Sequence, residues 1–492
     1  MVGAGQFVFV GQEGSLQEHG WDGPQRDKLW RYNQHYFDDL NAMGAPQRHA
    51  WHLALLKDWL DHNPPGKGNG WEPYPTSLRI VNWVKWALAG NQLPHECAHS
   101  LAVQARWLRK RLEWHLLGNH LFANAKALVF AGSFFEGPEA ESWLQTGWHI
   151  LARELPEQVL ADGGHFERST MYHALALEDV LDLLNVCRVY PSATGASGAK
   201  QAQELQQTAA RMQQWLHAMC HPDGEIGFFN DAALGIAPAV AELDAYAARL
   251  RVEGGAAVHS SSCVALQPSG YLRLQAGDAV ALLDVAPVGP DYLPGHAHAD
   301  TLSFEFSLGM QLVLVNSGTS CYGQGPERLR QRGTAAHNTV VVEGEDSSKV
   351  WGGFRVARRA RVQELHTTAE GDRATVAASH DGYTRLRRGL VHRRRWDLQP
   401  GRLVVEDELG VSDATGEARF HLPPGVQASA VTDPRRGRLV LPDGREIRWI
   451  AELGEPVVVA STWHPRFGAS IPSQCLRVRL VGGRCRVVFG WS

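Results

Sequence analysis

The chain has 492 residues, of which 44% are hydrophobic, and its 48 Lys and Arg nearly balance its 52 Asp and Glu. A chain of this length can bury a large core and is long enough for two or three domains. The formal net charge of -4 excludes a globally basic protein built to bind nucleic acid.

The stretch from Met1 to Val10 lacks the basic region and the long apolar core of a signal peptide. We therefore expect a cytoplasmic protein, or a periplasmic or secreted one whose numbering begins after a removed leader. No run of about 18 apolar residues occurs, so we expect no membrane span and no membrane partner. The seven cysteines are scattered without a C-x-x-C pair, which argues against a disulfide framework and a cysteine-based zinc site.

After a short extension over residues 1–27, apolar residues recur at helical spacing as far as about Leu250. The predicted helices cover residues 51–62, 78–89, 97–117, 118–135, 140–155, 172–189, 202–219 and 237–250. No repeat of fixed length is evident, so a helical solenoid is not supported.

From about Cys263 the chain changes to short β runs separated by Gly, Pro and Asp-Gly pairs. The predicted strands cover residues 271–275, 279–284, 301–307, 312–316, 339–343, 374–379, 403–407, 438–441, 446–450, 456–460 and 477–480. This spacing is typical of a large antiparallel sandwich. We predict an all-α domain over residues 1–260 followed by an all-β domain over residues 261–492.

Polar residues gather at the start of a predicted helix, where Asn119 and His120 are followed one turn later by Asn124. Such a cluster can line a pocket. The alternative is that Asn119 caps the helix and His120 is satisfied in the core.

A polar loop over residues 162–169 leads into the helix that carries Tyr172. A tyrosine is a plausible proton-transfer group only if neighbouring cations or imidazoles lower its pKa. The alternative is a capping loop, with Ser169 as the N-cap and Tyr172 half-buried.

In a third segment, Arg79 could bind a carboxylate through two hydrogen bonds, or form a salt bridge inside the helical domain.

His296, His298 and Asp300 occupy every second position before an apolar run, so on a strand their side chains would share a face. His337 lies just before another predicted strand. Imidazoles from His298 and His337 with one oxygen ligand would suit Zn²⁺. Asn316 is the oxygen donor placed to help, and Asp300 could substitute for it.

Several of these motifs together match one family, and the chain resembles the heparinase II/III-like polysaccharide lyases. The motifs are LWRYNQHYF at 29–37, WEPYPTSLRI at 71–80, GNHLFANAK at 118–126, DGGHFER at 162–168 with Met171 and Tyr172, GHAHAD at 295–300 and AHNT at 336–339. They cover about residues 28–355. The resemblance implies an incomplete α/α toroid followed by an antiparallel β-sandwich.

The resemblance also implies cleavage of a uronic-acid polysaccharide by β-elimination. Asn119 and His120 would neutralise the uronate carboxylate, which stabilises the enolate-like intermediate. Tyr172 would be the acid and is also a candidate base, and His296 is the other candidate base. From the matched motifs we expect further substrate contacts at His35, Tyr36, Arg79, Asn124 and Glu167.

The resemblance further implies a structural zinc ion held by His298, Asn316 and His337. Asn316 departs from the family pattern, which has Asp, and the loss of a charged ligand weakens the expected set. In this reading His296 faces the substrate and His298 the metal. Strict strand alternation would aim both imidazoles the same way, so residues 295–300 are predicted to form a loop or an irregular strand edge.

Two other functions fit parts of the sequence. A glycoside hydrolase would need two carboxylates flanking the bond, and Asp162 and Glu167 are available. A non-catalytic protein that binds acidic polysaccharide would share the fold without the catalytic activity.

The basic runs at 355–359 and 385–395 are either a solvated strand face or a contact with an anionic polymer. The expected partner is an anionic polysaccharide and not nucleic acid, while the sequence indicates neither the polymer nor an oligomeric state.

Overall fold

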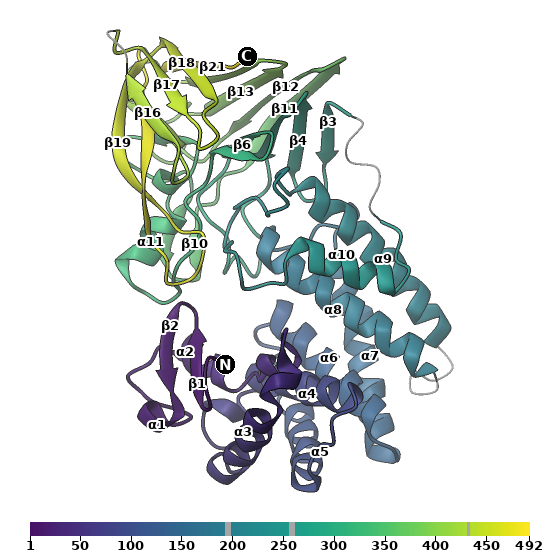
Figure 1. Cartoon of the computed structure of the whole chain (residues 1–492). Coiled ribbons are helices and arrows are strands. Elements are labelled where there is room, and N and C mark those ends of the chain that lie inside the picture. Colours follow the sequence, from purple (N-terminus) through teal and green to yellow (C-terminus); the bar gives the residue numbers. More distant parts are fainter. Residues whose placement is uncertain (192–197, 255–260, 431–432) are drawn as a thin grey trace. The chain divides into compact units, whose positions relative to one another are not determined.

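The computed structural model describes residues 1–191, 198–254, 261–430 and 433–492 (Figure 1). Contacts group the chain into two compact units, the first made of Met1–Gln158 and Asp179–Gln207 and the second of Val159–Glu178 and Thr208–Ser492. A segment of the predicted helical domain thus packs with the sheets. The boundary expected between residues 260 and 261 stays a prediction.

The first unit begins with a hairpin and continues in helices (Figure 1). Its elements are β1 (Gln6–Phe9), β2 (Gln12–Ser15), α1 (Leu16–His19), α2 (Lys28–Gln34), η1 (Asp38–Asn41), η2 (Ala45–Arg48), α3 (His49–His62), η3 (Asn69–Trp71), α4 (Pro73–Leu88), α5 (His95–Arg109), α6 (Gly118–Phe134) and α7 (Pro138–Gln158). The next helices, α8 (Thr170–Val189) and α9 (Gly198–Ala218), each contribute residues to both units. None of the helices in the described ranges is long and apolar enough to cross a membrane.

Helix α6 is buried nearly all round, and its buried residues are mostly apolar. It packs closely on α7 through two glycines. A Cβ at Gly132 would lie 2.7 Å from the Ala140 carbonyl oxygen, and one at Gly147 would lie 2.7 Å from the Ala125 carbonyl oxygen. Only glycine allows the two backbones to come this close.

The second unit holds α10 (Val240–Arg249), α11 (Pro326–Arg332), η5 (Thr334–Ala336) and antiparallel sheets. The five-stranded sheet runs in chain order through β3 (Cys263–Leu266), β4 (Tyr271–Ala276), β5 (Ala279–Asp284), β6 (Phe304–Leu308) and β7 (Gln311–Leu314). The eight-stranded sheet has the order β11 (Val362–Glu370), β12 (Arg373–His380), β13 (His392–Gln399), β14 (Arg402–Leu409), β21 (Arg484–Gly490), β18 (Glu446–Leu453), β17 (Arg436–Val440) and β16 (Gln427–Ala430). The four-stranded sheet has the order β19 (Glu455–Trp463), β20 (Ile471–Arg479), β15 (Gly416–His421) and β8 (Val340–Val342), and β9 (Lys349–Gly352) pairs with β10 (Arg355–Ala357).

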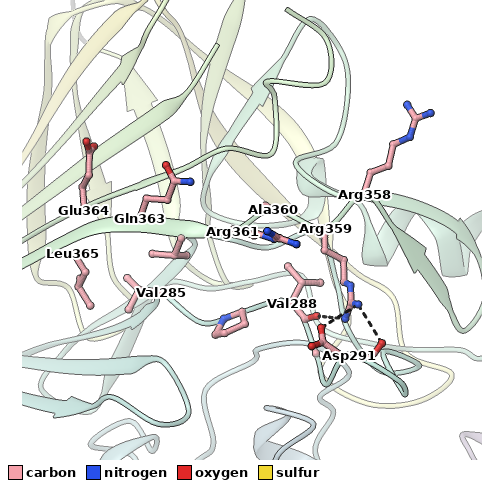
Figure 2. A pocket seen from close by; sticks show the side chains of 13 residues that line it. Val285, Val288, Asp291, Arg358, Arg359, Ala360, Arg361, Gln363, Glu364 and Leu365 are labelled. Carbon is pink, nitrogen blue, oxygen red and sulfur yellow. Dashed lines mark hydrogen bonds and ion pairs between the residues drawn. The ribbon is translucent and has the colours of Figure 1, made fainter. Parts of the chain in front are cut away.

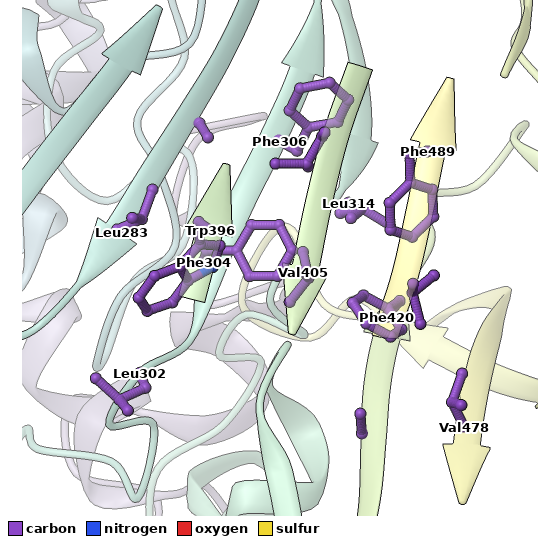
Figure 3. Packing of buried hydrophobic residues seen from close by; sticks show 14 of the residues in the cluster. Leu283, Leu302, Phe304, Phe306, Leu314, Trp396, Val405, Phe420, Val478 and Phe489 are labelled. Carbon is purple, nitrogen blue, oxygen red and sulfur yellow. The ribbon is translucent and has the colours of Figure 1, made fainter. Parts of the chain in front are cut away.

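Aromatic rings from the three large sheets meet in one core (Figure 3). The ring centroid of Phe304 on β6 lies 6.3 Å from those of Trp396 on β13 and Phe420 on β15. Phe420 in turn lies 5.4 Å from Phe489 on β21. All four side chains are buried, so these apolar contacts fix how the sheets pack and where their loops emerge.

The connection from β5 to β6, residues 285–303, carries His296, His298 and Asp300. It contains no strand, so the expectation of an irregular segment at 295–300 is confirmed.

Candidate functional site

The histidine-bearing loop is held by side chains as well as by backbone hydrogen bonds, among them one from the Asp231 N–H to the His296 carbonyl at 3.0 Å. The Asn230 amide oxygen accepts a hydrogen bond from the His298 backbone N–H at 3.0 Å, and the Asp300 carboxylate accepts one from the Asn230 N–H at 3.1 Å. Arg332 donates twice to the Ala297 carbonyl, at 3.1 and 2.6 Å. These bonds free the loop from strand alternation, so its two imidazoles need not point the same way.

Asp231 joins both imidazoles of the loop. One carboxylate oxygen lies 2.8 Å from His296 Nδ1 and the other lies 2.9 Å from His298 Nε2. Arg328 binds both oxygens of the same carboxylate. Burial alone would raise the pKa of Asp231, but the Arg328 guanidinium and the hydrogen bonds from the histidines hold it well below its ordinary value. Asp231 is therefore a permanent anion that orients both rings.

Tyr172 lies in the first turn of α8 and packs on His296. Its N–H donates to the Ser169 hydroxyl at 3.1 Å, so Ser169 caps the helix as the sequence alternative proposed. The ring centroids of Tyr172 and His296 are 3.9 Å apart, and the Tyr172 hydroxyl is 2.8 Å from that of Tyr322. Burial raises the pKa of Tyr172 well above its ordinary value, so the lowered pKa expected of a proton-transfer group is not found, and the phenol stays protonated, as an acid requires.

His296 is prepared to accept a proton. With Nδ1–H donating to Asp231, the neutral ring leaves the lone pair on Nε2, for which no hydrogen-bond partner exists among the described residues. The side chain keeps 14% of its surface exposed, so this nitrogen is not sealed in the core.

His298 and His337 face each other in a way that fits a cation. His337 Nδ1 lies 2.9 Å from the Gly333 carbonyl, to which it donates, and His298 Nε2 donates to Asp231. Those two bonds leave lone pairs on His298 Nδ1 and His337 Nε2, which are 3.1 Å apart. Burial lowers the pKa of His298 to about 4, so both rings are neutral. Two facing lone pairs need a shared proton or a metal ion between them.

The oxygen donor that the structure places with these imidazoles is Asp300. Its carboxylate and the nitrogens of His298 and His337 lie within 4.8 Å of one another. The Asn316 amide instead donates to the Phe228 carbonyl at 2.8 Å and accepts the Asn338 N–H at 3.1 Å. The donors fit zinc, with Asp300, which the sequence offered as the substitute, better placed than Asn316.

In the first unit, the predicted pair Asn119 and His120 begins α6. His120 Nδ1 lies 3.1 Å from the Glu113 carboxylate, and its ring centroid is 4.5 Å from that of Tyr74. The His120 side chain is 33% exposed. Asn119 is half-buried, and its amide has no hydrogen bond to any described residue. Both side chains are thus available to a ligand.

Other predicted substrate residues of the first unit lie deeper. Asn124 is buried, and its amide donates to the Glu113 carboxylate and the Ser77 hydroxyl, both at 3.0 Å. Tyr36 is almost fully buried, with its ring 6.0 Å from that of Tyr74. Asn124 therefore helps to hold the Glu113 carboxylate, which is the partner of His120.

Arg79 and His35 are fully buried. Arg79 donates to Gln104 at 3.0 Å and lies over the Trp59 ring at 4.0 Å. His35 Nδ1 accepts from Trp59 at 3.1 Å, and burial lowers the pKa of His35 to about 3. The geometry therefore favours structural roles for both.

In the second unit, Glu167 is buried with its carboxylate 3.8 Å from His165 Nδ1. Asp162 accepts hydrogen bonds from the Gly164 N–H at 3.0 Å and from the Ser269 hydroxyl at 2.7 Å. Asp162 thus organises its loop and is not part of a free carboxylate pair.

The sequence reading missed Asp231, Tyr322, Arg328 and Glu113. Asp231 follows an aromatic pair in Phe-Phe-Asn-Asp, and this buried acidic position was the one available signal. The others carry no motif of their own, because their roles arise from contacts with residues far away in the chain.

Comparisons with known proteins agree with this architecture. A family model for the Heparinase II/III N-terminus matches residues 46–248, and one described as Heparinase II/III-like, C-terminal matches residues 260–492. A heparin-sulfate lyase of Bacteroides stercoris is 25% identical over 64% of this chain and 47% of its own length, so the chain spans about half of that relative. FtsZ-localized protein C of Caulobacter vibrioides is 28% identical over 87% of this chain and 77% of its own. The crystal structure of heparinase III superimposes with a TM-score of 0.75 at 19% identity, covering 97% of this chain and 80% of the other.

The helices followed by antiparallel sheets define the fold class as that of the heparinase III structure. The chain belongs to the heparinase II/III-like family. The predicted family and fold class are both confirmed.

Proposed function

We propose that this protein cleaves a uronic-acid polysaccharide by β-elimination. The observation that carries the proposal is the contact between Tyr172 and His296. A protonated phenol and an imidazole with an open Nε2 lie with ring centroids 3.9 Å apart. An elimination needs one group that takes a proton and one that gives a proton, side by side.

The assigned roles balance the reaction. His296 Nε2 removes the proton from the carbon next to the uronate carboxylate. The electron pair forms a C=C bond to the neighbouring carbon, and the bond from that carbon to the glycosidic oxygen breaks. The Tyr172 hydroxyl protonates the departing oxygen. The raised pKa keeps the Tyr172 phenol protonated, which argues against Tyr172 as the base.

In this proposal Asn119 and His120 neutralise the uronate carboxylate. The carboxylate gains negative charge as the proton leaves, and hydrogen-bond donors placed on it lower the barrier. Glu113 supports this role because it fixes the His120 ring.

We also propose that His298, His337 and Asp300 hold a structural zinc ion. When bound, the ion would join the β5–β6 loop to the segment before β8. The role of these residues is to keep the His296 loop in place, and they take no part in the proton transfers.

The test is incubation with heparan sulfate, hyaluronan, chondroitin sulfate and alginate while ultraviolet absorbance is followed. Elimination leaves a C=C bond conjugated to the carboxylate, which absorbs. Tyr172→Phe should lower kcat by about 100-fold or more with unchanged thermal stability. Tyr322→Phe, which removes the neighbouring hydroxyl, should retain more activity. New reducing ends without the chromophore would contradict the proposal, as would normal turnover by Tyr172→Phe.

A second candidate is a non-catalytic protein that binds acidic polysaccharide. The observation in its favour is that FtsZ-localized protein C, which is not named as a lyase, matches more of this chain than the Bacteroides stercoris lyase does. Polymer binding without cleavage of any uronate polymer would favour this candidate. A glycoside hydrolase is disfavoured, because it needs two carboxylates flanking the bond and Asp162, one of the two candidates, is committed to its own loop.

A further inference from the structure

A cavity of about 950 Å³ lies in the second unit, between the start of the β5–β6 loop and the start of β11 (Figure 2). Val285, Pro287 and Val288 line one side, and residues 358–365 line the other. This volume is in the range of sites that hold a substantial organic ligand, and is far larger than a single inorganic anion needs.

One wall of the cavity is fixed by Arg359. Its guanidinium donates to the backbone carbonyls of Val288, Pro290 and Asp291 at 3.1 to 3.3 Å, and Figure 2 shows it reaching that loop. It also pairs with the Asp291 carboxylate at 3.2 Å. All of these Arg359 contacts are therefore made within the protein. The loop that Arg359 binds is the β5–β6 loop, which also carries His296.

Arg358 and Arg361 also line the cavity, and both are exposed. Within the described ranges neither guanidinium makes a hydrogen bond or an ion pair, and Figure 2 shows Arg358 extending away from the Arg359 contact. The lining carboxylate of Glu364 accepts from the Ser379 hydroxyl at 2.9 Å and lies 3.5 Å from Arg393. The cavity therefore carries two cations that no carboxylate of the described residues neutralises.

The other basic run of the sequence differs in this respect. Arg395 lies 3.3 Å from Glu406, and Arg394 donates to the buried Asp407 at 2.7 Å. Those two charges are balanced across the strands, whereas the guanidinium groups of Arg358 and Arg361 have no acidic partner among the described residues.

The backbone of the cavity wall is also strained. Arg358 has φ of 46° and Glu364 has φ of 51°, both in the left-handed region that favours glycine. Such conformations cost about 1 kcal/mol or more each and tend to gather at functional sites. At Arg358 the strain falls on a residue whose charge has no acidic partner in the part of the chain that the structure describes.

We propose that this cavity is a secondary subsite for an acidic oligosaccharide segment, with Arg358 and Arg361 binding its carboxylate or sulfate groups. The apolar side chains of Val288 and Leu365 would face the C–H surface of a sugar ring, while guanidinium groups bind oxyanions in a planar, two-pronged geometry. The inference rests on the proposed function for its substrate class. The cavity would increase affinity for the polymer and would take no part in bond cleavage.

The experiment measures binding of heparan sulfate and of hyaluronan to Tyr172→Phe protein, in which cleavage is blocked. The double variant Arg358→Gln/Arg361→Gln should bind about tenfold more weakly, with most of the loss disappearing at high salt. Arg358→Lys/Arg361→Lys should fall between, because it keeps the charge but not the planar geometry. Arg388→Gln/Arg448→Gln removes the same charge from exposed arginines outside the cavity and should bind like the parent.

Equal affinity of the cavity variant and the parent would overturn the inference, as would an equal loss in the control variant. In the otherwise wild-type chain, the cavity variant should raise KM for long chains and leave kcat on short oligosaccharides unchanged. If the wild type cleaves none of the polymers, the proposed reaction fails while the binding comparison still decides the subsite. If cleavage is normal but KM for long chains does not change, the subsite fails and the proposed reaction stands.

Discussion

Asp231 is a single buried carboxylate that serves three partners. It binds Arg328 through both oxygens, fixes the tautomer of His296 and holds the outer nitrogen of His298. The same carboxylate therefore orients the candidate base, His296, and a candidate metal ligand, His298. A change at this position should disturb both.

We predict that Asp231→Asn lowers the free energy of unfolding by about 3 kcal/mol, because it leaves the buried Arg328 guanidinium without its counter-charge. Chemical denaturation would measure the loss. Asp372→Asn removes an exposed carboxylate and serves as the control. A loss for Asp231→Asn no larger than that of the control would show that Arg328 does not depend on Asp231.

At the scale of elements, the packing of α6 on α7 depends on glycine. In an isolated helix, Gly→Ala would stabilise by about 1 kcal/mol through helix propensity. At Gly147 the added Cβ would lie 2.7 Å from the Ala125 carbonyl oxygen and 2.8 Å from a Val129 methyl group. Helix propensity predicts that Gly147→Ala stabilises the protein, whereas the close packing predicts that it destabilises. The sign of the measured change therefore shows which of the two dominates.

We predict that Gly147→Ala destabilises the protein by about 1 to 3 kcal/mol, because the helices must move apart. Thermal or urea unfolding would measure this change. His149→Ala, at an exposed position of the same helix, should change stability by less than about 0.5 kcal/mol. A stabilised Gly147→Ala protein would mean that α6 and α7 do not approach as closely as described.

The β5–β6 loop should depend on the proposed zinc ion. We predict that the purified protein contains about one zinc ion per chain and that a chelator lowers its Tm, since an ion that binds only the folded state stabilises it. His337→Ala should lack zinc and show no response to the chelator. His366→Ala, at an exposed position on β11, is the matched control. Wild-type protein without zinc and without a chelator effect would refute the zinc site.

At the scale of the whole molecule, each unit contains a buried carboxylate bound to cations. In the first unit, Asp182 lies 2.5 Å from both Lys85 and Lys126. In the second, Asp407 lies 2.7 Å from both Arg394 and His392. Burial alone would raise both pKa values, but the neighbouring cations lower that of Asp182 from 3.8 to about 2 and hold that of Asp407 well below its ordinary value.

A depressed folded-state pKa means that each carboxylate stabilises the protein above its unfolded-state pKa and stops doing so as the pH falls through the folded-state value. We predict that the free energy of unfolding decreases between about pH 4 and pH 2. The difference in stability between wild type and Asp182→Asn should be largest above pH 4 and shrink toward pH 2. Asp61→Asn, in an exposed pair with Lys57, should show little pH-dependent difference. A constant difference between wild type and Asp182→Asn would contradict the role of Asp182.

Much of the fold was predictable because its signals are local. Period-3.6 apolar patterns predicted the helices, and short β runs separated by turn residues predicted the sheets. The irregular course of 295–300 could also be inferred, since two histidines two positions apart could not serve different partners on a regular strand. The structural role of Arg79 could not be inferred, because a sequence does not show that Gln104 and Trp59 enclose its guanidinium.

The sequence by itself determined the family, the order of helices and sheets, and the candidates Tyr172, His296, His298 and His337, because each belongs to a short motif. Only the tertiary structure showed which residues orient those side chains. Asp231 reaches His296 across 65 residues of chain, and Arg328 reaches Asp231 across 97. Contacts over such separations leave no periodic or spacing signal, because the packing of the sheets, rather than chain distance, brings their partners together.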